Sequence, residues 1–263
     1  MMRIALGVEY DGSRFHGWQA QEEGVRTVQT SLEEALAKVA NHPVRVVCAG
    51  RTDTGVHGLG QVIHFDTDAQ RTPRNWVLGC NVNLPDDVSV TWAKEVDEDF
   101  SARFSALSRK YRYFILNRTA RSAPLAGRVT WIHRPLNADL MHQAAQALVG
   151  EHDFSSYRAL GCQAKSPIRT LHSISVERHD EFVVVSVHAN AFLHHMVRNI
   201  AGVLMAIGRE DQPADWAKTV LELRDRTLGG VTSPPEGLYF EQVEYPAEYD
   251  LPAASPSGFP IQP

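Results

Sequence analysis

The stretch Gly50-Arg51-Thr52-Asp53-Thr54-Gly55-Val56-His57-Gly58 separates two apolar segments that we expect to be strands, at about 44–49 and 60–66. Glycine bounds this polar stretch at both ends, as is typical of a loop. Residues 3–10 alternate between apolar and other side chains, which indicates a half-buried strand. Residues 27–40 have the apolar spacing of a helix. The first part of the chain therefore reads β-α-β-β, with the polar loop between its last two strands.

This order of elements continues and then repeats. In the first half, a helix that opens at Pro73 and a strand at about 88–96 complete a β-α-β-β-α-β unit. The second half predicts a strand through 111–116, a helix at 138–149, strands near 170–178 and 182–190, helices from about His194 and Pro213, and a last strand at 237–240. Two such units predict an α+β fold of two tandem ferredoxin-like (RRM-like) halves, whose antiparallel sheets join around a central catalytic cleft.

The halves predicted in this way are residues 1–100 and 101–250. Residues 251–263 carry four prolines, and we expect them to form a disordered tail. Of the 263 residues, 43% are hydrophobic and 22% are charged, so the chain as a whole is globular and not disordered.

Cysteine usage and the N-terminus indicate a cytoplasmic protein. The chain has 3 cysteines, and their spacing suits neither a disulfide framework nor a zinc ribbon. The N-terminus lacks the apolar core of a signal peptide, and no segment reaches the roughly 20 apolar residues of a membrane helix.

The net charge of −5 argues against a uniformly basic nucleic-acid binder, but the charge is unevenly spread. Residues 101–138 carry +8 with no Asp or Glu, so the rest of the chain carries −13. Seven of these eight charges are Arg, which favours bidentate phosphate recognition. Phe104, Tyr111, Tyr113 and Trp131 interleave with them, as suits phosphates and unstacked bases. A solvated strand whose acids lie elsewhere in the fold is equally consistent with this pattern.

Asp53 is the most informative acid in the sequence, because loops held by strands often carry catalytic residues. A lone Asp beside Gly more often caps a turn. Asp53-Thr54-Gly55 also matches the triplet of aspartic proteases, but those enzymes need two paired carboxylates. Only one such triplet occurs in this chain, and helices fall between its strands, so the protease interpretation is disfavoured.

Five motifs, in order, resemble those of the tRNA pseudouridine synthase A family. They are Tyr10-Asp11-Gly12 with Gly17-Trp18-Gln19, the string Ala49 to His57, Phe100 to Ala106 with Arg109-Lys110-Tyr111-Arg112-Tyr113, Asn190 to Asn199, and Glu236-Gly237-Leu238-Tyr239. The resemblance covers about residues 3–250. Thr54 departs from the pattern, since the family usually has Ala there, but this change removes no catalytic group.

The resemblance implies an isomerase that converts uridine to pseudouridine at positions 38, 39 and 40 of the tRNA anticodon stem-loop, without a metal or another cofactor. It implies that Asp53 is the essential carboxylate. Attack at C1′, attack at C6 and elimination through a glycal are all compatible with it. Because the target bases lie in or beside a stem, they must be flipped out.

Further residues carry roles that the resemblance implies. Arg198 matches the active-site Arg and is the first candidate for the counter-ion of Asp53, with Arg51 second, because an ionised Asp in a base-sized pocket needs a partner. Tyr111 matches a pocket Tyr that stacks on the base, and Leu238 matches a residue of the opposite wall. The expected phosphate contacts are Arg14, Arg109 and Lys110, and the expected assembly is a homodimer that binds one tRNA across both subunits.

Two points stay open at this stage. A catalytically silent RNA-binding protein could share this scaffold, although binding alone does not need Asp53, Tyr111 and Arg198 together. His194 and His195 could suggest a metal site, but no third ligand stands at a telling spacing. We therefore expect these two histidines to start a helix or to contact RNA.

Overall fold

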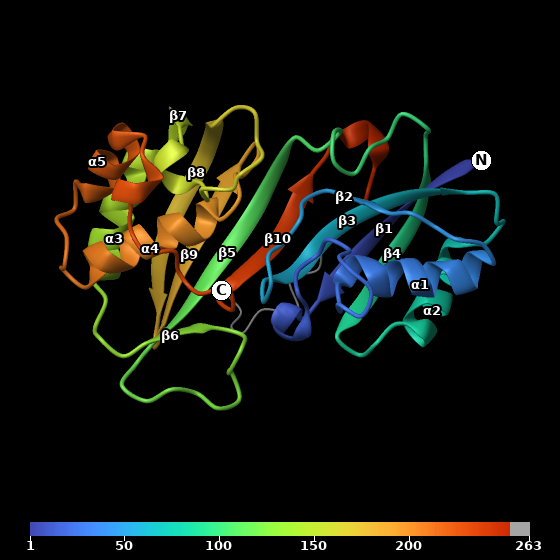
Figure 1. Ribbon diagram of the computed structural model, residues 1–263, viewed down its shortest axis with the longest axis horizontal. Helices are drawn as coiled ribbons and strands as arrows, with labels where there is room; N and C mark the ends of the chain where they lie inside the picture. Colours follow the sequence, from blue (N-terminus) through green and yellow to red (C-terminus); the bar gives the residue numbers. More distant parts are fainter. Residues whose placement is uncertain (253–263) are drawn as a thin grey trace. The chain divides into compact units, whose positions relative to one another are not determined.

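The computed structural model describes residues 1–252 and divides them into two compact units (Figure 1). The first unit comprises residues 1–107 and 239–252, and the second comprises residues 108–238. The division after residue 107 lies close to the predicted one after residue 100. The last strand differs, because from Tyr239 onward it belongs with the first unit and not with the second half. Most of the predicted tail, residues 253–263, lies outside the described residues.

The first unit is a mostly antiparallel sheet with helices. Its strands follow the order β4-β1-β3-β10, and β2 also pairs with β3. β1 is antiparallel to both β3 and β4, whereas β10 runs parallel to β3 with Tyr239 beside His57. The elements are β1 (Met2–Tyr10), η1 (Gly12–Arg14), α1 (Val28–Ala40), β2 (Val47–Cys48), β3 (His57–Thr67), α2 (Pro73–Asn83), β4 (Val88–Val96), β10 (Leu238–Glu244) and η5 (Ala247–Tyr249).

The alternation that predicted the first strand produces the core of the first unit. Ile4, Leu6 and Val8 lie on one face of β1 and are buried. They share one hydrophobic cluster with Leu32 and Leu36 of α1. Each such side chain contributes about 1.5–3 kcal/mol when fully buried, so this cluster ties α1 to the sheet.

Both helices of the first unit begin at threonine caps. The side chain of Thr27 accepts a hydrogen bond from the N–H of Thr30, and Thr72 does the same for Asn75. Pro73 occupies the first turn of α2, where its missing N–H costs nothing. The predicted helix start at Pro73 is confirmed.

The second unit repeats the mixed α+β organisation. Its strands follow the order β5-β9-β8-β7, with antiparallel pairs throughout, and β6 pairs in parallel with β5. The elements are β5 (Ser108–Asn117), β6 (Thr130–Ile132), α3 (Ala138–Ala145), η2 (Gln146–Leu148), β7 (Gly150–Asp153), η3 (Ser155–Tyr157), β8 (Ile168–His179), β9 (Phe182–Ala189), α4 (Met196–Gly208), α5 (Trp216–Leu223) and η4 (Arg226–Leu228).

The second unit differs from the sequence prediction in three places. β6 and β7 were not predicted, because they span only 3 and 4 residues and β7 reads Gly-Glu-His-Asp, without apolar alternation. The helix predicted over 138–149 ends as α3 at Ala145 and continues as the 3-10 turn Gln146–Leu148. Gly150 then has φ 110°, which ends the helical path.

Within residues 1–252, no helix has both the length and the apolar character that crossing a bilayer requires. The longest helices, α1 and α4, have 13 residues each. A bilayer needs about 20.

Buried His64 makes the stability of the first unit pH-dependent. Its Nδ1 accepts a hydrogen bond from the N–H of Ala102 at 3.0 Å. Burial and the nearby Arg3 guanidinium lower the pKa of His64 to about 4. As the pH falls below the ordinary His pKa of about 6.5, the unfolded chain binds the proton more readily than the folded one. This stabilisation is therefore complete above pH 6.5 and is lost as the pH falls toward 4.

We expect the free energy of unfolding to fall by roughly 1 to 2 kcal/mol more in the wild type than in His64→Asn between pH 6.5 and 4.5. Asn keeps an acceptor near the position of Nδ1 but does not titrate. Urea unfolding at a series of pH values measures the difference. Parallel curves for the two proteins would contradict the assignment.

Candidate functional site

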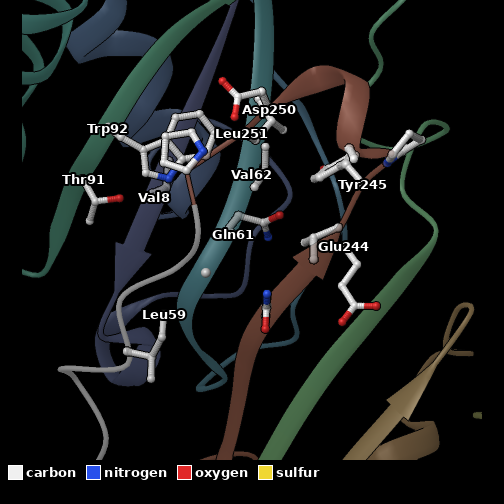
Figure 2. Close-up of a pocket in the computed structure, with 17 residues that line it drawn as sticks. Val8, Leu59, Gln61, Val62, Thr91, Trp92, Glu244, Tyr245, Asp250 and Leu251 are labelled. Atoms are coloured by element: carbon white, nitrogen blue, oxygen red, sulfur yellow. The ribbon is translucent and has the colours of Figure 1, made fainter. Parts of the chain in front are cut away.

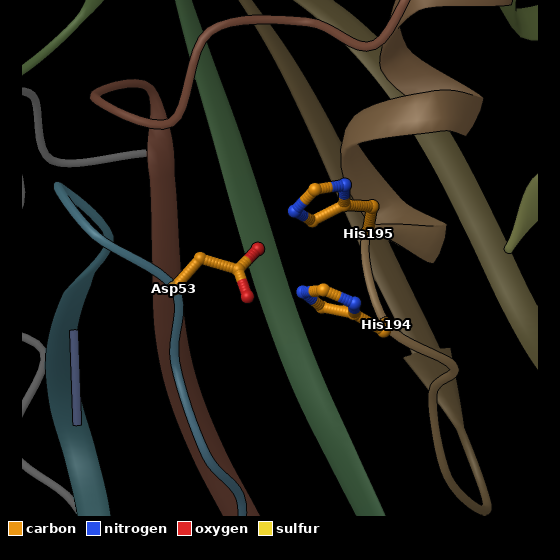
Figure 3. A group of neighbouring side chains, drawn as sticks. All are labelled: Asp53, His194 and His195. Atoms are coloured by element: carbon orange, nitrogen blue, oxygen red, sulfur yellow. The ribbon is translucent and has the colours of Figure 1, made fainter. Parts of the chain in front are cut away.

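Asp53 lies in the loop between β2 and β3 of the first unit (Figure 3). Its side chain is half-buried, and its carbonyl oxygen accepts a hydrogen bond from the N–H of Val56 at 3.1 Å. Gly55, inside this turn, has φ 80°, a conformation that glycine adopts without strain. The loop is thus a tight turn that places the carboxylate of Asp53 between two strand ends.

The residues that precede Asp53 in the loop are anchored within the first unit. The hydroxyl of Thr52 lies 2.8 Å from the hydroxyl of Tyr10, and the carbonyl of Thr52 accepts from the N–H of Trp18 at 2.9 Å. The side-chain amide of Gln61 donates to the carbonyl of Gly50 at 2.6 Å and accepts from its N–H. Thr52, Tyr10 and Gln61 are all buried, so water does not compete for these bonds.

The segment after β1 approaches the loop so closely that two of its positions require glycine. A Cβ on Gly12 would overlap the carbonyl of Val56. A Cβ on Gly17 would lie 2.9 Å from the carbonyl oxygen of Thr52 and 3.2 Å from the carbonyl carbon of Asp53, and Gly17 also has φ 85°. The backbone of Asp53 is therefore braced by direct contact with a neighbouring backbone.

The two other predicted site residues of the first unit are exposed. Arg51 lies two residues before Asp53 in the same loop, and Arg14 ends the short helix η1. An exposed guanidinium stays hydrated and its side chain can change conformation. Such a group is better suited to contact an anion that comes and goes than to form a buried ion pair.

In the second unit, Tyr111 and Tyr113 lie on the same face of β5, since they pair with Val187 and Val185 of β9. Tyr113 is fully buried, and its hydroxyl bonds to Thr130 and to the carbonyl of Pro234. Burial raises its pKa well above the ordinary value. The ring of Tyr111 meets Phe192 edge-on, with centroids 5.0 Å apart. Both tyrosines are buried, but Tyr113 is buried completely, whereas Tyr111 keeps 8% of its surface exposed.

Arg198 lies in the first turn of α4 and is half-buried. Its Nε donates to the carbonyl of Ser233 at 2.9 Å, and its own carbonyl accepts from the N–H and the hydroxyl of Ser233. A cation at a helix N-terminus adds to the positive end of the helix dipole, so this end of α4 favours an anion.

The segment that contacts Arg198, residues 231–233, packs directly on α4 and forms hydrogen bonds with it. Asn199 donates to the carbonyl of Tyr157 and accepts from Thr232 and Arg226. A Cβ on Gly202 would overlap the carbonyl of Val231. The Arg198 side chain is therefore directed by a hydrogen-bonded network, whose members the sequence analysis did not single out.

His194 and His195 immediately precede α4, and their rings lie 4.0 Å apart between centroids (Figure 3). His195 is the N-cap and has φ 62°, a left-handed conformation that a non-glycine residue adopts only when its surroundings impose it. The prediction that these residues start a helix is confirmed. Leu238, at the start of β10, is buried, and its N–H donates to the carbonyl of Pro235.

The basic segment does not form one surface. Arg109 and Lys110 are neighbours on β5, so their side chains leave opposite faces of the sheet. Arg109 donates to the carbonyl of Asn190 at 2.9 Å. Arg118 and Arg134 are paired with Glu181 and Asp211 at 2.9 Å in each case. Part of the +8 is thus neutralised by ion pairs, and Arg109 and Lys110 lie on opposite faces of the sheet.

A cavity of about 360 Å³ lies elsewhere in the first unit (Figure 2). Trp92, Gln61 and Val62 line it from the sheet, and Tyr245 and Asp250 line it from the segment that includes η5. None of the predicted site residues is among the described residues that line it. The cavity is therefore separate from the loop that carries Asp53.

The structure brings some predicted residues together and adds others. Arg51 shares a loop with Asp53, and Tyr111, Arg198 and Leu238 all lie in the second unit. The sequence analysis missed the roles of Thr52, His57 and Gly17, which hold or border the Asp53 loop. All three stand in quoted motifs, and Gly17 and His57 are types that serve tight turns and polar contacts. That signal could have indicated them.

The sequence matches a known family over parts of both units. The family model for tRNA pseudouridine synthase matches residues 7–105 and 144–246. The chain therefore belongs to the tRNA pseudouridine synthase family, whose members are isomerases. It is 59% identical to tRNA pseudouridine synthase A of Alcanivorax borkumensis over 96% of this chain and 94% of the relative. It is also 59% identical to the proteins of that name from Pseudomonas aeruginosa, over 95% and 88%, and from Nitrosococcus oceani, over 97% and 98%.

The contact of Gly17 with the loop predicts different costs for two similar substitutions. Gly17 and Gly24 have nearly equal φ values, 85° and 88°, but a Cβ on Gly24 meets nothing within 4 Å. Gly24→Ala should cost only about 1 kcal/mol of backbone strain. Gly17→Ala should cost about 1–3 kcal/mol more, because it also pushes the backbone of residues 52–54. Chemical denaturation of the two variants measures this, and equal losses would contradict the close approach.

Proposed function

We propose that this protein isomerises uridine to pseudouridine at positions 38, 39 and 40 of the tRNA anticodon stem-loop. The observation that carries the proposal is the match to the tRNA pseudouridine synthase family over most of the chain, with Asp53 in a braced loop inside the matched region. The reaction detaches uracil from C1′ of the ribose, turns the base and rejoins it through C5. No atom is gained or lost.

Asp53 is proposed as the essential carboxylate, with Arg198 as its partner and Arg51 as the second candidate. The hydrogen bond that Nε of Arg198 donates to the carbonyl of Ser233 supports a fixed guanidinium, which is what a charge partner needs. Tyr111 is proposed to stack on the flipped uracil while the base is detached, and Leu238 to line the opposite wall. The edge-on contact of Phe192 leaves Tyr111 oriented and supports this role.

We infer that each unit is a ferredoxin-like element. In the first unit β1 lies between β4 and β3, and β2 also pairs with β3, while in the second unit β9 lies between β5 and β8; these pairings support the fold inference. Arg14, Arg109 and Lys110 are proposed phosphate contacts. The proposed assembly is a homodimer acting on tRNA in the cytoplasm, without a metal or another cofactor.

The central test is to incubate an unmodified tRNA transcript with the protein and to map pseudouridine. We expect product at positions 38–40. Asp53→Asn should bind tRNA as the wild type does but form no product, because an amide is neither a nucleophile nor a base. Asp86→Asn, an exposed Asp of the same unit, is the matched control and should be fully active. Absence of product with the wild type would refute the function, and an active Asp53→Asn would refute the role of Asp53.

Arg198→Lys tests the guanidinium separately from its charge. Lys keeps the charge but loses the Nε donor to Ser233 and the planar fork, so the rate of pseudouridine formation should fall at least about 10-fold. Arg178→Lys is the control, since Arg178 donates to Asn117 and Leu136 in the same unit. Single-turnover rates measure both. A rate for Arg198→Lys equal to that of Arg178→Lys would exclude the proposed pairing.

A further inference from the structure

His57 follows the Asp53 loop directly and is held in an unusual way. It is 2% exposed, at the first position of β3. Its Nδ1 lies 3.1 Å from the backbone nitrogen of Gly12 and 3.3 Å from Oδ1 of Asp11. Its ring stacks on Tyr239, with centroids 4.5 Å apart and planes inclined by 19°. Nδ1 accepts from the N–H of Gly12 when it carries no proton and donates to the carboxylate of Asp11 when it does, so the Asp11–Gly12 turn holds the same ring nitrogen in either state while Tyr239 covers the ring face.

Such an arrangement is a costly way to fill a core position. Nε2 of His57 is buried without a hydrogen bond to any described residue, and burying a polar atom unpaired costs about 1–3 kcal/mol. An apolar side chain would fill the same space without that cost. Simple packing therefore does not account for histidine here, whereas a polar contact with the Asp11–Gly12 turn does.

Asp11 is in turn fixed from two further directions. Its side chain accepts from the N–H of Ser13 at 3.0 Å, and its own N–H donates to the carbonyl of Asp87 at 3.0 Å. The hydrogen bond with His57, followed by those with Ser13, holds the pKa of Asp11 well below its usual range. The turn that grips His57 is therefore rigid and charged.

The contacts of His57 fix the end of the loop that follows Asp53. Gly50 and Thr52 are tied to Gln61, Tyr10 and Trp18, and these bonds fix the part of the loop before Asp53. After Asp53, the backbone turns back at Val56 and enters β3 at His57. The grip on His57 is the side-chain contact that fixes this returning end.

We propose that His57 is a positioning residue, which Asp11 and Gly12 hold so that the end of the loop stays fixed and the carboxylate of Asp53 keeps one orientation. The proposal rests on the proposed function, because it takes Asp53 as the reacting group. Releasing the grip lets the loop end move by a fraction of an ångström or more. A displacement of about 1 Å at a reacting group can cost about 100-fold in rate.

The test compares Asp11→Asn with Asp66→Asn. Asn at position 11 keeps the acceptor for Ser13 but removes the charge that faces His57. Asp66 is the matched control, because its carboxylate pairs with Arg3 at 2.7 Å near the other end of β1 and β3, away from the loop. We expect kcat for pseudouridine formation to fall about 10- to 100-fold in Asp11→Asn, with KM for tRNA changed less than about 2-fold. Asp66→Asn should keep both constants.

A purely structural role would give a different result. In that case both variants would lose stability, and the kcat of the two would stay alike at a temperature where both are folded. A rise in KM with unchanged kcat would place Asp11 in tRNA binding. Either outcome would overturn the proposal.

Two variants at position 57 provide an independent check. His57→Asn places an amide near the position of Nδ1 and can still meet the Asp11–Gly12 turn, whereas His57→Leu cannot. We expect His57→Asn to keep at least about 5-fold more kcat than His57→Leu. Equal kcat values for the two folded variants would contradict the role of the Nδ1 contact.

Amide hydrogen exchange separates this inference from the proposed function, since it needs no catalysis. Peptides covering residues 52–57 should exchange faster in Asp11→Asn than in the wild type, and at the wild-type rate in Asp66→Asn. If the wild type formed no pseudouridine, the proposed function would be refuted. The exchange data would still show whether the contacts of Asp11 and Gly12 with His57 hold the loop. Unchanged exchange in Asp11→Asn would refute the grip itself.

Discussion

The close approach of the Tyr10–Trp18 segment to the Asp53 loop is the constraint on which the arrangement of the first unit depends. Two backbones meet with no room for a Cβ at Gly12 or at Gly17. Because the contact is between backbones, the loop cannot shift without moving β1, which is itself paired on both sides. The loop of nine residues, 50–58, has two small hydroxyl side chains and can make few contacts within itself. Contacts with neighbouring segments therefore fix its conformation.

The second unit directs Arg198 by a similar principle with different parts. The segment carrying Thr232 and Ser233 packs directly on α4 at Gly202, and its polar atoms are paired with Arg198, Asn199 and Arg226. Arg198 thus resembles Asp53 in being held by neighbours that do not themselves react. In the first unit the contacts hold the backbone around Asp53, whereas in the second unit a loop residue, Ser233, bonds both the side chain and the backbone of Arg198.

Charge illustrates the limits of composition. The net charge of −5 is the sum of a +8 segment, residues 101–138, and an acidic remainder. The basic side chains of that segment in turn differ in their directions and partners. Alternation along β5 separates Arg109 from Lys110, and ion pairs with Glu181 and Asp211 absorb Arg118 and Arg134. Counting charges along a chain indicates that basic groups are present. Only their directions and partners indicate how many can meet a phosphate.

The sequence by itself determined most of the regular elements and indicated the residues that we propose to react. Apolar periodicity placed β1 and α1, Pro73 marked a helix start, and the string around Asp53 helped to identify the family, because each of these signals lies in neighbouring residues. The tertiary structure decided what holds those groups. The pairing of β10 with β3, the contact of Gly17 with Thr52 and the grip of Asp11 and Gly12 on His57 join residues that lie 35 or more positions apart. Such contacts depend on how strands and loops pack in three dimensions. The periodicity of neighbouring residues does not specify this packing.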